Sequence, residues 1–315
     1  MIEPYRKLAF EADFATVSTN RTGRQQSMAG RRQLTMEAMA AALKVRRDMR
    51  VQLWAPVSVY DLADQMGVEV RFIECSSMEG IYRKANNPVI LISSLRPAGR
   101  QAYTCAHELG HHVFGHGSRV DELVDVSSMQ NPRDPQEILA DNFAGFLLMP
   151  KSAVERAFAV RGWDLRSCTA LQVYIIAGWL GVGYTTLLFH MVNTLHLIPL
   201  SWARELEKTP PRKIRAMYMR PDIKENLIIV DTHWSERAID VQAGDFIQLP
   251  PGVLHEGDCV RSQEHNRSGH LFGAVFPGTG RFYHPITGWA AYVRVSRRNY
   301  VGRSIFRHLE DPDDD

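Results

Sequence analysis

The chain has 315 residues, of which 45% are hydrophobic, enough for the cores of about two domains. Its formal net charge of +2 is nearly balanced, which excludes nucleic-acid binding driven by overall charge and leaves only local basic clusters. The four cysteines, at 75, 105, 168 and 259, form no close pair, and the first residues include no apolar signal segment. These features predict a protein of the reducing cytoplasm.

The N-terminal segment is polar. Residues 15–33 lack hydrophobic periodicity, so we expect residues 1–33 to form a flexible polar arm. A helix should follow, because Thr35 can cap it and apolar residues from Met36 to Leu43 share one face. A basic run from Lys44 to Arg50 ends this helix. Such a run is by default a solvated helix end, and nucleic-acid contact is the alternative.

A short helix and three strands are predicted next. The helix begins after Ser58 and ends at Gly67, and residues 68–72 have the character of a strand. Residues 80–84 and 89–93 are two further apolar runs joined through Ala-Asn-Asn-Pro, so they predict a hairpin.

The segment His107-Glu108-Leu109-Gly110-His111 carries the strongest chemical signal in the chain. Two histidines four residues apart lie one helical turn apart on one face, so both imidazoles can reach one ion. In this H-E-x-x-H pattern the histidines hold Zn²⁺ and the glutamate is the general base. The flanking apolar residues recur at helical spacing: Ala102, Ala106, Leu109 and Val113. The bare pattern also arises by chance on charged helices, so the choice depends on a third ligand.

The metzincins, a class of zinc peptidases with a third histidine ligand, are excluded by the residues that follow His111. That class requires Gly three residues and His six residues after His111, where this chain has Phe114 and Gly117. His112 and His116 are the first candidates for the third ligand by their place in the sequence. Residues 117–133 read as a loop, which contains Glu122 and Asp125 as rival third ligands. Cys105 precedes His107 by two residues, so it should face elsewhere and pack as a buried thiol.

A second helix offers a better carboxylate. Asp134 reads as its N-cap, followed by Pro135, and Pro150 stops it, so Glu137 falls in the first turn. Glu137 is either the third ligand or an ordinary capping glutamate. Asp141 lies one turn further along an apolar helix, where burial without a partner would be unfavourable. We therefore expect Glu137 to bind the metal and Asp141 to hydrogen-bond a ligating histidine.

These two blocks resemble a known family. Thr104-Cys105-Ala106-His107-Glu108-Leu109-Gly110-His111-His112 and Glu137-x-x-Ala-Asp-x-Phe-Ala-x-x-Leu-Leu-Met-Pro150 are similar to the ImmA/IrrE zinc metallopeptidases, and the resemblance extends more weakly over residues 50–200. It implies that the third ligand is Glu137, whereas Asp141 stands where the family commonly has Asn. It further implies cleavage of a helix-turn-helix repressor that silences a stress, mobile-element or phage-defence operon. Because the strand before the metal helix often borders the cleft in zinc peptidases, residues 89–93 should pair with the substrate.

After a helix that begins at Ser152, residues 167–203 form a long uncharged run. Glycines interrupt it, and its apolar segments fall short of the ~20 residues that a membrane span needs. The pattern fits a helix-turn-helix over residues 169–197: Thr169-x-x-Gln172 is a capping box and Gly181 marks the turn. The second helix, from Thr185 to Leu195, lacks the basic and amide side chains that read DNA. We expect it to pack on the peptidase core.

The remainder, residues 204–315, should be a linker followed by a β-rich sensor or regulatory domain. Strands are predicted at 227–230, 245–249, 270–275 and 290–295. Some relatives carry a GAF-like sensor at this place, but these residues show no diagnostic motif for one. The segment from Gly244 to His255 matches half of a cupin metal motif, and a Pro-Gly turn explains it better. Aromatic and basic side chains alternate near the C-terminus, as in proteins that bind single-stranded DNA: Tyr292, Arg294, Arg297, Arg298 and Tyr300. An amphipathic strand and helix is the alternative.

Together these patterns predict an α+β protein with a zincin-like metallopeptidase core over residues 34–203, which includes the helix-turn-helix-like subdomain. It would be a zinc endopeptidase with Glu108 as general base, and single-stranded DNA or a small molecule would be the activating signal. The resemblance implies a helix-turn-helix repressor as its substrate. The alternative is a transcriptional regulator or nucleic-acid sensor with an inactive peptidase fold. No membrane association is expected.

Overall fold

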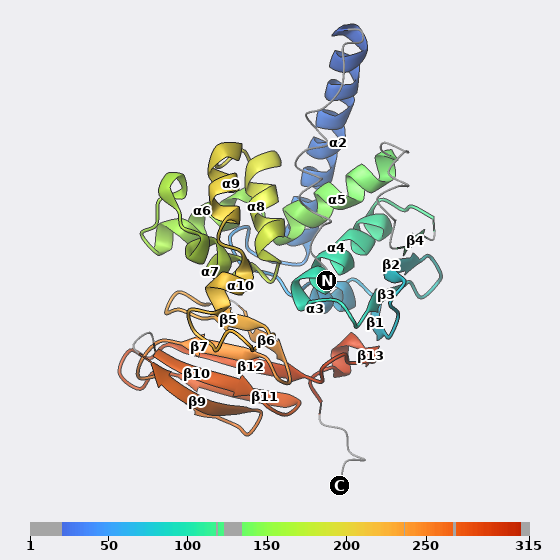
Figure 1. Ribbon diagram of the computed structural model, residues 1–315. Helices are drawn as coiled ribbons and strands as arrows, with labels where there is room; N and C mark the ends of the chain where they lie inside the picture. The colour runs from blue at the N-terminus through green and yellow to red at the C-terminus, as the bar shows by residue number, and fades with distance from the viewer. Residues whose placement is uncertain (1–20, 118, 123–133, 236, 267–268, 310–315) are drawn as a thin grey trace.

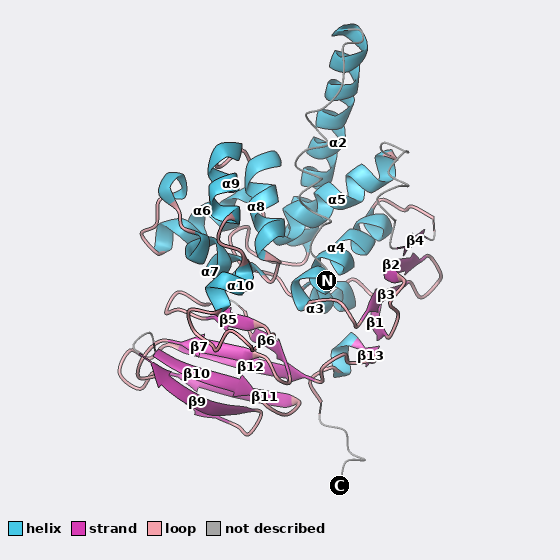
Figure 2. Ribbon diagram, in the orientation of Figure 1, coloured by secondary structure: helices cyan, strands magenta, loops and turns pink. Residues whose placement is uncertain are grey.

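The computed structural model describes residues 21–309 apart from 118, 123–133, 236 and 267–268. Figure 1 shows three parts: a small sheet covered by helices, a neighbouring group of short helices, and below them a body of strands. In Figure 2 the upper part is mostly helical, with one small sheet beside its helices, whereas the lower part consists mainly of strands. The structure is therefore a mixed α+β protein, as predicted.

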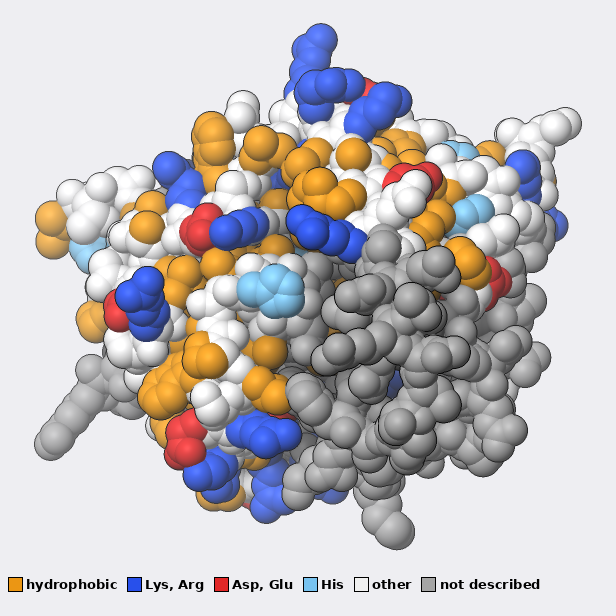
Figure 3. Space-filling model, turned by 90° about the horizontal axis from the view of Figure 1, so that it is seen from above, with side chains coloured by type: hydrophobic (Ala, Val, Ile, Leu, Met, Phe, Trp, Pro, Cys, Tyr) orange, Lys and Arg blue, Asp and Glu red, His pale blue; other side chains and the backbone are white. Residues whose placement is uncertain are grey.

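Helix α2 (Arg21–Asp48) projects beyond the rest of the described chain (Figure 1). It begins at Arg21, so the predicted flexible arm is wrong for residues 21–33, and residues 1–20 lie outside the described part. Over its whole length α2 is rich in Arg, Ala, Gln and Met, which favour helix without needing an apolar stripe. Figure 3 looks down on this end of the molecule, where hydrophobic side chains lie among Lys and Arg.

The basic run at the end of α2 is only partly solvated. The Arg46 side chain is fully buried. It donates to the carbonyl of Gln52 at 2.8 Å and to the carbonyls of Ala55 and Leu147. Burial lowers the pKa of Arg46 to about 10. The prediction of a solvated helix end is thus wrong for Arg46, which joins α2 to the end of α5 (Pro135–Leu148).

One five-stranded sheet has the order β13-β1-β3-β2-β4. Its strands are β1 (Glu69–Ile73), β2 (Met78–Arg83), β3 (Val89–Ser93), β4 (Arg119–Glu122) and β13 (Gly302–Arg303). The predicted hairpin is present as the antiparallel pair β2 and β3, and β1 lies parallel to β3. Two helices contact this sheet: α3 (Val59–Gln65) lies against β1, and α4 (Ala98–Val113) against β2 and β3.

The position of β3 corrects one prediction. Because β3 is bonded on both sides, by β1 and β2, its backbone is not free to pair with a substrate. Residues 89–93 therefore cannot be the cleft edge that we predicted. Within the described residues, the edge on the β2 side of the sheet is β4, which pairs only with β2.

The short helices form a separate group beside the sheet (Figure 1). They are α6 (Lys151–Val160), η2 (Leu165–Ser167), α7 (Ala170–Leu180), α8 (Tyr184–Asn193), α9 (Leu200–Glu207) and α10 (Pro211–Arg215). The predicted capping box of Thr169 and Gln172 begins α7, and Gly181 ends it with φ +73°. That a helix-turn-helix subdomain is formed here stays a prediction.

In the described part of the chain, no single helix is long and apolar enough to cross a membrane. Taken together, α7 and α8 reach the required length and composition, but the pair is bent by 101°.

The strands of the lower body form two four-stranded sheets. One has the order β5-β7-β10-β9 and the other β6-β12-β11-β8. The bounds are β5 (Leu227–Ile229), β6 (Ile239–Gln242), β7 (Phe246–Leu249), β8 (Leu254–Glu256), β9 (Val260–Asn266), β10 (Gly269–Ala274), β11 (Gly278–Tyr283) and β12 (Ala290–Ser296). Phe272 and Phe282 meet between the two sheets with ring centroids 5.1 Å apart. The four predicted strands are confirmed, and Gly252 (φ +80°) makes the predicted turn before His255.

After β12 the chain returns to the five-stranded sheet. Strand β13 pairs antiparallel with β1, and the short helix η3 (Ser304–Phe306) follows (Figure 1). Arg294 forms ion pairs with Asp61 at 3.0 Å and with Asp240 at 2.6 Å. Residues 302–303 thus belong to the first sheet, which the predicted boundary at residue 204 did not anticipate.

We expect the pairing of Asp240 and Arg294 to stabilise the protein in a pH-dependent way. Burial would raise the pKa of Asp240, but the hydrogen bonds and charge of Arg294 outweigh it and lower this pKa to about 2. Asp240→Asn should lower the free energy of unfolding at pH 7 by about 2 kcal/mol. The difference should persist above the ordinary carboxyl pKa of 3.8 and shrink as the pH falls toward 2, because wild-type Asp240 then becomes protonated.

Denaturant unfolding of both proteins at several pH values measures this difference. Asp61→Asn is the matched control, since Asp61 contacts the same Arg294 but its side chain is 42% exposed, and it should lose less than about 1 kcal/mol. Equal losses in the two variants, or a difference for Asp240→Asn that stays constant down to pH 2, would contradict the prediction.

Candidate metal centre

Helices α4 and α5 bring the predicted metal ligands together. His107 and His111 are buried on α4, and Glu137 lies in the first turn of α5, where Asp134 accepts a hydrogen bond from the N–H of Gln136 at 3.0 Å. Gly110 lies between the two histidines. A Cβ at Gly110 would come within 3.0 Å of the Ala140 Cα, so the glycine permits the close approach of α4 and α5.

The donor atoms of these three residues surround one point. The Nε2 atoms of His107 and His111 are 3.1 Å apart, and the Glu137 carboxylate oxygens lie 3.2 Å and 3.6 Å from them. Tetrahedral zinc with bonds of about 2.0–2.2 Å needs ligand atoms roughly 3.3–3.6 Å apart. Two imidazoles and one carboxylate are also a donor set of catalytic zinc. The residues therefore fit a zinc ion with one open position.

The electrostatics of Glu137 suit a cation. Hydrogen bonds from His107 and His111 hold the pKa of this carboxyl well below its usual range. Glu137 is therefore a carboxylate at neutral pH. Within the part of the chain that the structure describes, His107, His111 and Glu137 are the one group of His, Cys, Asp and Glu side chains that could hold a metal.

Asp141 contacts the first histidine. Its Oδ1 lies 2.9 Å from His107 Nδ1, so it can accept the hydrogen bond that turns the opposite nitrogen toward the metal position. We expected Asp141 to be buried in an apolar helix, and this is wrong, because its side chain is 61% exposed. The contact itself has the geometry that we expected for a residue that orients a ligand.

His116 does the same for the second histidine, and the sequence analysis missed this role. Its Nδ1 lies 2.8 Å from the Nδ1 of His111, so one of the two nitrogens donates to the other. The turn that follows α4 makes this possible: Gly115 has φ +68°, and the N–H of His116 donates to the His111 carbonyl. The Gly between His112 and His116 was the only sequence signal of such a turn. His112 is occupied elsewhere, with its Nδ1 3.0 Å from the Tyr82 hydroxyl.

Glu108 is fully buried beside strand β2. A Cβ at Gly80 would come within 2.7 Å of Glu108 Oε1 and 2.5 Å of a Thr104 methyl. The backbone of β2 thus forms a wall for the general-base candidate, and only glycine leaves that carboxylate its space. The sequence analysis placed Gly80 in a hairpin without seeing this contact.

The remaining candidates divide into three groups. Cys105 is buried and unbonded to any other cysteine, as predicted, and burial raises the pKa of its thiol. Asp125 and the side chain of Glu122 lie outside what the structure describes. The half cupin motif gives no metal group: the His255 ring packs edge-on against Phe272.

The predicted nucleic-acid residues do not form one free surface. Tyr292 is 68% exposed on β12. Arg294 is held by Asp240 and Asp61, Arg298 contacts Asp245 at 3.3 Å, and Tyr300 packs edge-on against Phe72. Arg297 is half-buried between these positions. Arg294 and Tyr300 therefore have structural partners, which the alternation of aromatic and basic residues could not reveal.

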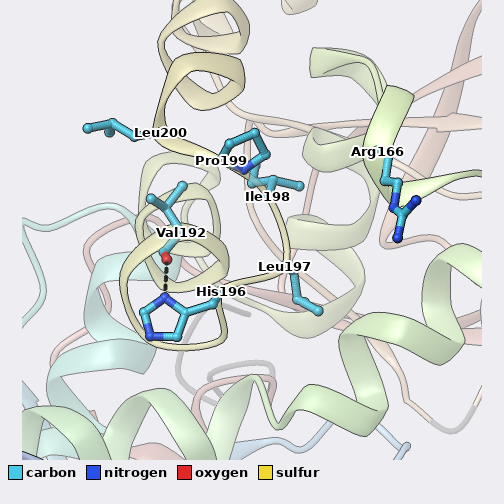
Figure 4. Close-up of a pocket in the computed structure, with 7 residues that line it drawn as sticks. All are labelled: Arg166, Val192, His196, Leu197, Ile198, Pro199 and Leu200. Carbon is cyan, nitrogen blue, oxygen red and sulfur yellow. Dashed lines mark hydrogen bonds between the residues drawn. The ribbon is translucent and has the colours of Figure 1, made fainter.

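A cavity of about 620 Å³ lies over the chain that follows α8. Figure 4 shows the residues that line it: Val192 and His196 at the end of α8, residues 197–200 of the following chain, and Arg166 from a separate segment. The His196 Nδ1 lies 3.0 Å from the carbonyl of Val192 (Figure 4), a bond that satisfies the end of α8. His196 Nδ1 therefore has a structural role at the end of α8, and none of the predicted metal ligands lines this cavity.

Comparison with known proteins gives two findings. Residues 63–188 match the family described as the IrrE N-terminal-like domain. The chain is also 27% identical over 123 residues to the radiation response metalloprotease IrrE of Deinococcus radiodurans. That alignment covers 38% of this chain and 37% of the relative, so the similarity spans little more than a third of either protein. The family match includes α4, Glu137 and Asp141.

The site predicts a specific effect of Glu137 on metal content. Glu137→Ala should lower zinc occupancy well below that of the wild-type protein, because two histidines alone leave the ion under-coordinated. Glu122→Ala and Asp125→Ala should keep wild-type zinc. Metal analysis of the three purified variants provides the measurement, and a fully loaded Glu137 variant would refute this ligand assignment.

Proposed function

We propose that the protein is a zinc endopeptidase that cleaves a helix-turn-helix repressor, because residues 63–188 match the IrrE N-terminal-like domain of the ImmA/IrrE metallopeptidases. Cleavage would induce a stress-response or phage-defence operon in the cytoplasm. The observation that carries the proposal is the convergence of His107, His111 and Glu137 within one ligand sphere, with the buried Glu108 on the same helix.

The residues of the site have distinct roles in this proposal. His107, His111 and Glu137 would hold zinc, which when bound polarises a carbonyl and acidifies water. Glu108 accepts a proton from the attacking water and returns it to the leaving amine. The wall made by Gly80 keeps the Glu108 carboxylate in place. Asp141 and His116 orient the two imidazoles through their Nδ1 atoms.

The free edge of the five-stranded sheet is consistent with a peptide as the substrate. Strand β4 pairs with β2 and, among the described residues, with no other strand. An extended peptide can add to such an edge through main-chain hydrogen bonds. Since β2 also borders Glu108, a peptide on this side of the sheet would lie near the reacting groups. We therefore assign β4, in place of β3, as the strand that guides the substrate.

The competing function is a transcriptional regulator with an inactive peptidase fold. The helix pair α7 and α8, joined by the left-handed Gly181, is the feature that favours it. The two functions differ in what Glu108 does. A regulator that only binds its partner has no need of a general base, whereas a peptidase loses its activity without one.

Glu108→Gln is the test of catalysis. It keeps the size of the side chain and the zinc ligands but removes the base, so cleavage of the repressor should fall by at least about 100-fold. Binding to the repressor should remain at the wild-type level. The neighbouring gene products are to be identified first, and any helix-turn-helix protein among them is incubated with wild-type and variant protein.

Zinc analysis of the same preparations serves as the control, because it separates loss of the base from loss of the metal. If Glu108→Gln cleaves as fast as the wild-type protein, the chemistry lies elsewhere. If neither protein cleaves while both bind the repressor, the regulator is the better description.

A single-stranded DNA signal is a further part of the proposal. Tyr292 is exposed, and Arg281 stands opposite it in the β11–β12 register, which places an aromatic and a basic residue side by side. Such a surface would bind bases by stacking and phosphates by charge. Binding of labelled single-stranded DNA should weaken steeply with salt, and Tyr292→Ala should weaken it further.

Tyr300→Ala tests whether Tyr300 belongs to the DNA-binding surface or only stabilises the fold. Because Tyr300 packs against Phe72 and donates to the Arg303 carbonyl at 3.1 Å, its loss should lower stability more than DNA affinity. A titration at two salt concentrations, with cleavage measured with and without DNA, decides the matter. No binding at low salt, or cleavage indifferent to DNA, would leave a small molecule as the signal.

A further inference from the structure

A large cavity lies where the three parts of the molecule meet. Its volume is about 720 Å³, in the range of pockets that enclose small ligands. The first turn of α4, the turn between α7 and α8, and the strands β5 and β6 all contribute to its wall. The cavity is separate from the metal centre, since none of His107, His111 and Glu137 lines it.

The charge of the wall favours an anion. Seven Lys and Arg side chains line the cavity against three carboxylates, those of Glu225, Asp240 and Asp245. Arg215 and Lys224 form no ion pair with any carboxylate of the described residues. The Nε of Arg215 is buried and makes no hydrogen bond within that part of the chain, although the Arg215 side chain also hydrogen-bonds Tyr174. A cationic side chain without a carboxylate partner gains more from binding an anionic ligand than one that is already paired.

The rest of the wall is aromatic or bare backbone. Six aromatic rings line the cavity: Tyr60, Phe72, Tyr174, Tyr184, Trp234 and Tyr300. Glycines at 99, 178, 181 and 183 expose main-chain groups between them. Helix α4 starts here after Pro97 without a side-chain cap, so its first N–H groups point toward this end of the helix. Flat apolar surfaces next to cations and amides suit a ring that carries an acidic group.

We propose that this cavity binds a small anion with an aromatic ring, of the size of a mononucleotide. Arg215 and Lys224 pair with the phosphate or an equivalent acidic group, and the tyrosines contact the ring. This inference rests on the proposed function and deepens its alternative of a small-molecule signal, because it gives that signal a chemical class and a site.

The position of the cavity connects the ligand to the peptidase. Helix α4 lines the cavity with its first turn and carries His107 nine residues later, about 14 Å along the helix axis. The same ligand would touch β5 and β6 of the lower sheets. Bound ligand therefore adds contacts between the lower sheets and the helix that bears the metal ligands.

The test is calorimetric titration of the full-length protein with adenosine 5′-monophosphate, adenosine and inorganic phosphate. We expect the monophosphate to bind with a dissociation constant below about 1 mM, and adenosine and phosphate each to bind more weakly. Arg215→Gln should weaken binding of the monophosphate by at least about tenfold. Arg212→Gln is the matched control, because Arg212 is exposed on the same short helix and does not line the cavity.

Gly178→Leu provides a second variant that keeps every charge. A Cβ at Gly178 would meet only Ile228, at 3.9 Å, so the larger side chain can enter the cavity without disturbing the backbone. It should abolish binding while the melting temperature stays at or above that of the wild-type protein. Absence of binding to the wild-type protein at 1 mM nucleotide, or equal affinity in Arg215→Gln and wild type, would overturn the proposal. Since the titration needs no cleavage, its outcome is independent of whether the protein is a peptidase.

Discussion

The contact between α4 and α5 at Gly110 is the constraint on which the metal centre depends. The two histidines on α4 can share an ion with Glu137 only if the helix that carries Glu137 comes within a few ångströms of them. The absence of a side chain at Gly110 permits this approach, since a Cβ there would lie 3.0 Å from the Ala140 backbone. Hydrophobic burial along α5 holds the two helices together.

A second constraint fixes the direction of the ligand side chains. Each imidazole has an Nδ1 partner on the side away from the metal position: Asp141 for His107 and His116 for His111. Both partners lie outside α4, the helix that carries the two histidines: Asp141 is on α5 and His116 is in the turn after α4. The geometry of the donor set is thus built from several elements, so it exists only in the folded chain.

The lower sheets are joined to the peptidase by more than the linker. Strand β13 extends the peptidase sheet, and Asp61 of α3 contacts both Arg294 and Arg307. Ion pairs of this kind are strong only when they are shielded from water, and Asp240 and Arg294 are mostly buried. Any signal received by the lower sheets therefore has a direct structural connection to the sheet that borders Glu108.

The sequence by itself determined the local chemistry of this protein. Four-residue spacing placed His107 and His111 on one face, the cap and proline signals gave the bounds of α5, and alternating apolar residues located most strands. These features depend on neighbours within a few residues. What only the tertiary structure decided depends on distant ones: the place of β3 inside its sheet, the pairing of β13 with β1, the burial of Arg46, and the contact of His116 with His111. Local propensity carries no information on which segments meet, because packing and long-range hydrogen bonds choose among many pairings that suit the same local pattern.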